Sequence, residues 1–194
     1  MVSREDLDDV YQPAEDSHLL ASAAIDSMGP LDPDALVVDV GTGSGYVAAR
    51  VGEATDARVV GVDISPLAVR EAREHGVSVL RGDLLEPIRG PVDVVLFNPP
   101  YLPTDPENEW DDWMEYALSG GEDGRRAIEP FLADLPRVLA PEGRAYLLVS
   151  SLTDPEAVRA HAEEQGLDAR QVGEESFPFE TLSVWEITLR NFPE

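Results

Sequence analysis

Short apolar runs alternate with amphipathic segments along most of this chain. Runs typical of buried strands cover residues 35–40, 57–63, 77–80, 91–97 and 143–151. Helical patterns fill most of the intervals between them. Parallel strands need a long crossover connection, which is usually a helix, so this alternation indicates a mostly parallel sheet. The sequence therefore predicts a doubly wound α/β fold with helices on both faces of the sheet.

The predicted helices and a last pair of strands complete this fold. The predicted helices cover residues 17–28, 46–54, 65–76, 125–140 and 155–165, and the fourth continues past Pro136 or kinks there. Residues 169–176 and 181–189 are typical of an antiparallel pair, which brings the number of strands to seven. A chain of 194 residues suits one domain, 1–194, with an N-terminal segment and helix at 1–30 and a catalytic core at 31–194.

The composition is strongly acidic. Asp and Glu number 39 against 14 basic residues, all of them Arg, and the formal net charge is -25. Such self-repulsion is tolerated where concentrated salt screens it, which predicts a halophilic host. A halophilic surface argues only weakly against nucleic acid, but no basic stripe is present, so we do not expect a nucleic-acid partner. Without Cys, disulfides are excluded. The acidic N-terminus predicts no signal peptide and no run reaches membrane-spanning length, so we expect a cytoplasmic protein.

A glycine-rich turn, DVGTGSG, follows the first predicted strand and opens a helix (Asp39 to Gly45). A turn of this kind lets a ligand approach bare backbone at a helix N-terminus. Its spacing departs from the dinucleotide fingerprint, and no Lys follows it as in a P-loop. Taken alone, the turn is explained equally well as a tight connection that needs glycine.

Two further carboxylates follow the next two strands. Asp63 ends the second strand, about twenty residues after the glycine turn, where a carboxylate can accept the hydroxyls of a ribose. Asp83 follows the third strand and has the position to accept from an adenine amine. Either residue alone is explained as a helix cap or turn residue. Together with Asp39 they favour a nucleoside site, because ligands of open parallel sheets bind at this edge.

The fourth strand ends in FNPPYLP, Phe97 to Pro103. Two consecutive prolines stiffen the chain and leave its carbonyls without local donors. We expect Asn98 Oδ1 and the Pro99 carbonyl each to accept one N–H of a planar NH2 group, while Tyr101 stacks on that group. Catalysis would then consist of positioning and electrostatic stabilisation. A turn of two prolines capped by Asn explains the stiffness but not the location.

These elements together resemble the class I S-adenosylmethionine-dependent methyltransferases. The glycine turn matches the first motif, Asp63 the second, and Asp83 with Leu84 the third. NPPY falls where the family has its fourth motif. The resemblance implies a sheet ordered 3-2-1-4-5-7-6 and S-adenosylmethionine as cofactor, with its methionine part at the glycine turn, its ribose at Asp63 and its adenine at the third motif.

The flanking residues narrow the resemblance. VYQPAEDS (Val10 to Ser17) and SGGEDGR (Ser119 to Arg125) resemble elements of the compact archaeal and eukaryotic branch of the HemK-type release-factor glutamine methyltransferases. That resemblance implies N5-methylation of the glutamine in the Gly-Gly-Gln loop of the class I release factor. The cofactor-binding residues that the resemblance implies are Ser17, Asp39, Gly41, Gly43, Asp63, Ile64, Asp83, Leu84 and Asn98. Asn98, Pro99, Pro100 and Tyr101 would bind the substrate, and Asn98, Pro99 and Tyr101 would carry catalysis.

The resemblance also implies partners. The release factor is the expected substrate, alone or in complex with its GTPase partner. Compact enzymes of this branch work with a small zinc-binding activator subunit, and an exposed edge strand is where a partner adds a strand. We therefore expect a heterodimer that uses Gly76 to Arg81. No metal site is expected in this chain.

Two rival hypotheses remain open. NPPY also occurs in amino-methyltransferases that act on adenine or guanine of RNA or DNA, although no basic stripe or target-recognition domain accompanies it here. A non-catalytic cofactor-binding subunit is the other rival, and the intact NPPY argues against it. The segment with Trp110, Trp113 and Tyr116, spaced about one helical turn apart, is either a packed helix or a substrate-facing lid.

Overall fold

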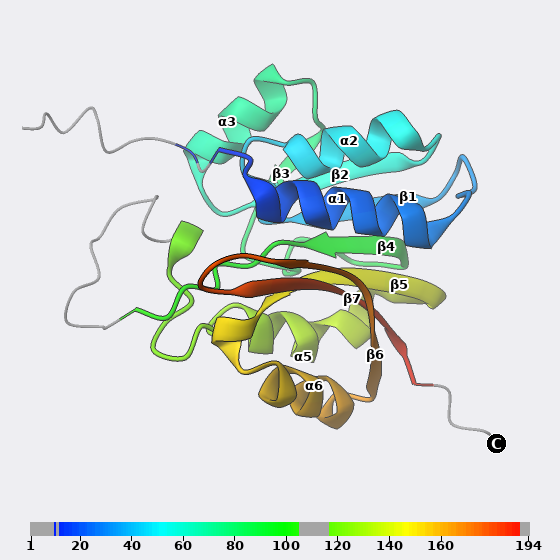
Figure 1. Ribbon diagram of the computed structural model, residues 1–194. Helices are drawn as coiled ribbons and strands as arrows, with labels where there is room; N and C mark the ends of the chain where they lie inside the picture. Colours follow the sequence, from blue (N-terminus) through cyan, green and yellow to red (C-terminus); the bar gives the residue numbers. More distant parts are fainter. Residues whose placement is uncertain (1–9, 11, 105–116, 191–194) are drawn as a thin grey trace, which may run out of the picture.

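The computed structural model describes residues 10, 12–104 and 117–190 (Figure 1). One seven-stranded sheet in the order β3-β2-β1-β4-β5-β7-β6 runs through this part of the chain. Its strands are β1 (Leu36–Val40), β2 (Arg58–Asp63), β3 (Val79–Arg81), β4 (Val92–Phe97), β5 (Leu139–Ser150), β6 (Leu167–Ser176) and β7 (Thr181–Leu189). The first five pair in parallel, and β7 is antiparallel to both β5 and β6. The predicted fold class and strand order are confirmed.

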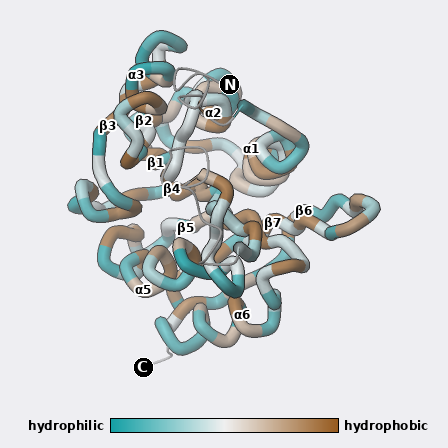
Figure 2. Tube along the Cα trace, turned by 90° about the vertical axis from the view of Figure 1, so that its left-hand side faces the viewer, coloured by the Kyte–Doolittle hydropathy of each residue, from teal (hydrophilic) through white to brown (hydrophobic). Residues whose placement is uncertain are grey.

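Helices cover both faces of the sheet. They are α1 (Glu15–Met28), α2 (Tyr46–Ala54), α3 (Pro66–Glu74), α5 (Ile128–Val138) and α6 (Pro155–Glu164), with a short 3-10 turn, η2 (Ser151–Thr153), after β5. In Figures 1 and 2, α1, α2 and α3 lie on one side of the strands, and α5 and α6 lie on the other. The β6–β7 end of the sheet extends past the helices in Figure 2.

Alternation along the strands divides the core into two layers. Val37 of β1 and Val94 and Leu96 of β4 pack with α1 and α2, whereas Val38 of β1 and Phe97 of β4 pack with α5. Successive side chains of a strand point to opposite faces, so a strand buried on both sides is apolar throughout. This is why the runs ALVVDV and PVDVVLF are apolar at almost every position.

Several boundaries differ from the sequence-based prediction. The third strand begins at Val79 rather than at Val77, and its helical predecessor ends at Glu74. The predicted helix 125–140 is shorter, because α5 runs from Ile128 to Val138 and β5 starts directly after it. Pro136 lies inside α5 near its end, where the missing proline N–H costs only one hydrogen bond of the last turn.

Candidate active site

A cavity of about 550 Å³ opens at the carboxyl edge of β1, β2 and β4. Its volume is in the range of small-molecule sites. Every residue that the sequence analysis singled out for cofactor or substrate lines it: Ser17, Asp39, Gly41, Gly43, Asp63, Ile64, Asp83, Leu84, Asn98, Pro99, Pro100 and Tyr101. The structure therefore brings these residues together around one space, while the role of each stays a prediction.

The glycine turn forms the floor of the cavity between β1 and α2. Gly41 has a φ of 62° and Gly45 a φ of 85°, a left-handed conformation that glycine adopts without strain. A Cβ on Gly45 would also lie 2.9 Å from Val77. The turn closes with a hydrogen bond from the Gly45 N–H to the Thr42 carbonyl (2.8 Å). Tight geometry of this kind presents the bare backbone of the turn to a ligand.

Asp39, the last carboxylate before the turn, is buried. Its Oδ2 accepts hydrogen bonds from Thr42 Oγ1 (2.6 Å) and from the Ala48 N–H (3.2 Å). Burial raises the pKa of Asp39 to about 7, against the opposing effect of these two hydrogen bonds. Because a buried carboxylate is costly unless it is paired, this residue gains from a cationic ligand group beside it.

Asp63 links the glycine turn to the start of α3. Its Oδ2 accepts from the Gly43 N–H (2.9 Å) and its Oδ1 from the Ser65 N–H (2.8 Å). Burial raises the pKa of Asp63, and these backbone donors partly offset the rise. Each carboxylate oxygen has a further lone pair, so both can still accept from the hydroxyls of a ribose.

The third motif forms the far wall of the cavity. Asp83 and Leu84 follow β3 in a turn closed by a hydrogen bond from the Glu86 N–H to the Asp83 carbonyl (3.0 Å). Leu84 has a φ of 43°, which is unfavourable for a side chain with a Cβ. Strained backbone of this kind clusters at ligand sites, and here it lies at the residue that the sequence assigns to adenine.

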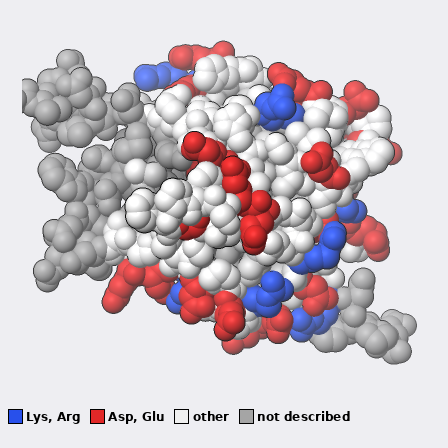
Figure 3. Space-filling model, viewed as in Figure 1, with Lys and Arg blue, Asp and Glu red and all other residues white. Residues whose placement is uncertain are grey.

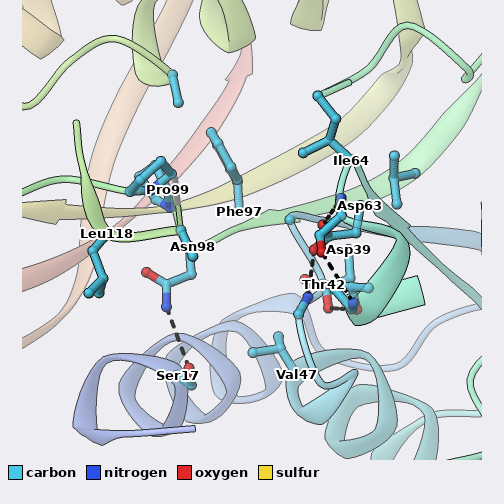
Figure 4. A pocket seen from close by; sticks show the side chains of 18 of the residues that line it. Ser17, Asp39, Thr42, Val47, Asp63, Ile64, Phe97, Asn98, Pro99 and Leu118 are labelled. Atoms are coloured by element: carbon cyan, nitrogen blue, oxygen red, sulfur yellow. Dashed lines mark hydrogen bonds between the residues drawn. The ribbon is translucent and has the colours of Figure 1, made fainter. Parts of the chain in front are cut away.

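Asn98 stands at the opposite end of the cavity, after β4. Its side-chain nitrogen donates to Asp16 Oδ2 (3.1 Å) and lies 3.4 Å from Ser17 Oγ, as Figure 4 shows for Ser17. Its Oδ1 is buried and has no partner among the described residues. A carboxylate oxygen only accepts, so the contact with Asp16 fixes the orientation of the amide and leaves Oδ1 unsatisfied in a residue that lines the cavity. The site therefore presents an unsatisfied acceptor.

The SGGEDGR element holds the NPPY loop in place. The Leu102 N–H donates to the Leu118 carbonyl (3.1 Å) and the Gly120 N–H to the Leu102 carbonyl (2.9 Å). Gly124 packs so closely on Tyr101 that an added Cβ would lie 2.6 Å from the Tyr101 carbonyl oxygen. This contact gives a physical reason for the glycine in the element.

Sequence reasoning missed two of the carboxylates that line the cavity. Asp16 holds Asn98, and its only local signal was its place inside VYQPAEDS. Glu180 reaches the cavity from the connection between β6 and β7, and nothing near it in the sequence indicated this. The segment with Trp110, Trp113 and Tyr116, interpreted above as either a packed helix or a lid, lies outside the described residues.

Several observed features of the cavity suit the binding of S-adenosylmethionine. It has a bare glycine turn and a buried carboxylate for the methionine part, a second carboxylate for the ribose, and an orphaned acceptor at the far end. Ligands of open α/β sheets bind at this edge. With a sheet ordered 3-2-1-4-5-7-6, these features place the chain among the class I S-adenosylmethionine-dependent methyltransferases.

Similarity to known proteins shows which family of these methyltransferases the chain belongs to. Residues 37–117 match the family model described as a methyltransferase domain. The Methanocaldococcus jannaschii protein MJ0928, provisionally named a protein N5-glutamine methyltransferase, is 35% identical over 91% of this chain and 90% of its own length. Human methyltransferase HEMK2 is 32% identical over 96% of this chain and 93% of its own. The chain belongs to the HemK-type protein-glutamine methyltransferases.

A solved structure agrees with this assignment. The E. cuniculi Mtq2-Trm112 complex, which is described as responsible for methylation of the eRF1 translation termination factor, matches with a TM-score of 0.75 and 30% identity. The match covers 92% of this chain and 98% of that one. No described helix is long and apolar enough to cross a membrane. Within the same residues, no group of three or more His, Asp or Glu side chains could hold a metal ion.

Proposed function

We propose that this enzyme methylates the side-chain nitrogen of the glutamine in the Gly-Gly-Gln loop of the class I release factor. The observation that carries the proposal is the orphaned Oδ1 of Asn98 at the end of the cavity. A buried acceptor without a partner costs free energy until a donor binds, so it selects a ligand that carries an N–H. The related E. cuniculi complex, which acts on eRF1, supports a release factor as the source of that N–H.

The site suits a primary amide in particular. An amide nitrogen is a poor nucleophile because its lone pair is delocalised, so it must be held in line with the methyl group that it accepts. Asn98 Oδ1 takes one of its N–H groups, and the Pro99 carbonyl, to which no described group donates, takes the other. Tyr101, half-buried beside them, stacks on the planar amide.

The chemistry is a direct displacement. When bound, the cofactor supplies an electrophilic methyl group on a sulfonium sulfur. Asn98 and Pro99 fix the amide nitrogen, and their oxygens stabilise the positive charge that it gains as the new N–C bond forms and the bond from the methyl carbon to sulfur breaks. The electron pair of the broken bond stays on sulfur, and the nitrogen then loses its extra proton to solvent. Positioning and electrostatics of this kind supply most of the rate enhancement, and no covalent link to the chain is needed.

The amino group of an RNA or DNA base could donate a hydrogen bond to the same oxygen, Asn98 Oδ1. The acidic surface, however, does not suit a polyanion. Figure 3 shows acidic side chains over the visible face, with few basic ones among them. The formal net charge is -25. Binding to a phosphate backbone depends on clustered Lys and Arg. The relatives named as glutamine methyltransferases also favour the protein substrate.

The proposal includes a small zinc-binding activator subunit. β3 is an edge strand of only three residues, and Leu80 at its centre is 44% exposed. An exposed apolar edge invites a partner strand, and the E. cuniculi relative is a complex with Trm112. We infer that the activator pairs along Gly76 to Arg81, and that the substrate is the release factor alone or with its GTPase partner. The acidic composition supports a halophilic host. The Methanocaldococcus jannaschii relative supports an archaeal host, and a sequence without Cys fits a reducing cytoplasm.

A reconstituted assay tests the function. The enzyme, with and without its activator, is incubated in high salt with labelled S-adenosylmethionine and with the intact release factor or a glutamine-to-alanine variant of its Gly-Gly-Gln loop. We expect label in the natural factor and none in the variant. Equal label in both proteins would place the methyl group elsewhere, and label in total RNA instead would favour the nucleic-acid rival.

A further inference from the structure

A second carboxylate stands at the acceptor end of the cavity. Glu180 lies between β6 and β7 and lines the cavity together with Asp16, Asn98 and Tyr101. Its main-chain carbonyl accepts from the Phe177 N–H (2.7 Å), which closes the hairpin turn. Its Oε2 accepts from Ser150 Oγ (2.7 Å), at the end of β5. Glu180 is therefore held at both ends and directed over the carboxyl edge of the sheet.

The other oxygen of Glu180, Oε1, accepts no hydrogen bond from any described residue. The side chain is half-buried. Burial raises the pKa of Tyr101, and the nearby charges of Asp16 and Glu180 raise it further. The phenol therefore stays protonated beside two carboxylates, and Oε1 of Glu180 adds a second acceptor to the same end of the cavity.

We propose that Glu180 is a substrate-binding residue that accepts a hydrogen bond from a main-chain N–H next to the target glutamine. This inference rests on the proposed function. Asn98 and Pro99 use both N–H groups of the target amide, so the next donors that the substrate brings into the cavity belong to its main chain. The glycines before the glutamine carry no side chains, so their backbone can approach closely. Glu180 thereby favours a glycine-rich loop over other glutamines.

Three variants test the assignment on the intact release factor, with the activator present. Glu180→Ala removes the acceptor, Glu180→Gln keeps an acceptor oxygen without the charge, and Glu175→Ala is the matched control. Glu175 is exposed in the same hairpin and does not line the cavity. Initial rates give kcat and KM, calorimetry gives the affinity for S-adenosylmethionine, and thermal unfolding checks the fold.

Charged acceptors are worth more than neutral ones, so we expect kcat/KM to fall roughly 10- to 100-fold in Glu180→Ala and no more than about fivefold in Glu180→Gln. Glu175→Ala should match the parent enzyme, and cofactor affinity should be unchanged in all three. Because Gln can also keep the contact with Ser150, unchanged thermal unfolding of Glu180→Ala is what separates recognition of an N–H from a purely structural role.

The outcomes distinguish this inference from the proposed function. A parent enzyme that leaves the glutamine unmethylated overturns both. An active parent enzyme with an equally active Glu180→Ala variant overturns only the role of Glu180. Equal loss in Glu180→Gln and Glu180→Ala would mean that the site recognises a positive charge rather than an N–H. Loss of cofactor binding or of thermal stability in Glu180→Ala would assign the residue to the fold instead.

Discussion

The side-chain nitrogen of Asn98 donates to Oδ2 of Asp16 over 3.1 Å, and the two residues are 82 positions apart in the sequence. This bond connects the end of β4 to the first turn of α1. It fixes the orientation of the Asn98 amide, with the NH2 group toward Asp16 and Oδ1 left without a partner among the described residues. The N-terminal helix therefore takes part in the site, because it orients the residue that is to hold the substrate amide.

Asn98→Ala should nearly abolish methyl transfer and leave cofactor binding largely intact. The variant removes the orphaned acceptor at the substrate end, whereas the glycine turn and Asp63 lie elsewhere in the cavity. By analogy with other preorganised polar groups, we expect kcat to fall roughly 100- to 1,000-fold. Single-turnover rates and calorimetry with S-adenosylmethionine measure the two effects. Equal loss of both would mean that Asn98 binds the cofactor instead.

Asp16→Ala should act through Asn98. Without the carboxylate, only the longer contact with Ser17 Oγ remains, and a hydroxyl can pair with either end of an amide, so Asn98 can flip and turn its NH2 group toward the substrate. We expect kcat to fall about 10-fold or more while the cofactor affinity changes little, since a misplaced group affects mainly the reacting geometry.

Asp26→Ala provides the control for that experiment. Asp26 is an exposed carboxylate of the same helix and does not line the cavity, so its removal should leave kcat unchanged. A double variant, Asp16→Ala with Asn98→Ala, should be no slower than Asn98→Ala alone. Additive losses would refute the idea that Asp16 works by orienting Asn98.

Asp39 should make the free energy of unfolding fall as the pH rises. Burial holds the pKa of Asp39 at about 7, whereas the unfolded chain ionises near the ordinary value of 3.8. Between these values the folded state keeps a proton that the unfolded state has lost, so stability decreases with pH by at most about 4 kcal/mol.

Asp39→Asn removes this titration and isolates its contribution. The stability of the parent protein minus that of the variant should be largest near pH 4 and should decline toward pH 7. Denaturant unfolding without cofactor across this range, at constant salt, measures the difference. A difference that does not vary with pH would contradict the raised pKa of Asp39.

Leu80→Lys should weaken association with the activator subunit. A charged side chain on the edge strand opposes the addition of another strand. Leu152→Lys is the matched control. Leu152 is 42% exposed, against 44% for Leu80, but it lies in η2, which follows β5 and not the edge strand β3. Co-purification and light scattering of the complex give the result. Equal weakening by both variants would remove β3 from the interface.

Much of the fold followed from the sequence because its elements are strongly periodic. β1 and β4 are buried on both faces and read as continuous apolar runs, and α3 begins with Ser65 and Pro66 at its cap and first position. The strand order came from the family resemblance, since local patterns do not say which strands are neighbours. β3 was misplaced by two residues because a strand of three residues carries almost no periodic signal.

The cofactor end of the site was accessible to sequence reasoning because each of its groups follows a strand directly. Parallel strands bring such positions to one edge. The substrate end was less accessible. Asp16 and Glu180 reach Asn98 and Tyr101 only through the packing of α1 and of the β6–β7 hairpin on the sheet. No pattern within a few residues of either predicts a contact across 80 positions.

Tandem mass spectrometry of the Gly-Gly-Gln peptide of the release factor, from cells with and without this gene, tests the central claim most directly. The account predicts a methyl group on the glutamine nitrogen that disappears with the gene and returns with the natural enzyme but not with Asn98→Ala. A glutamine with the same methylation state in both cell lines would contradict the account.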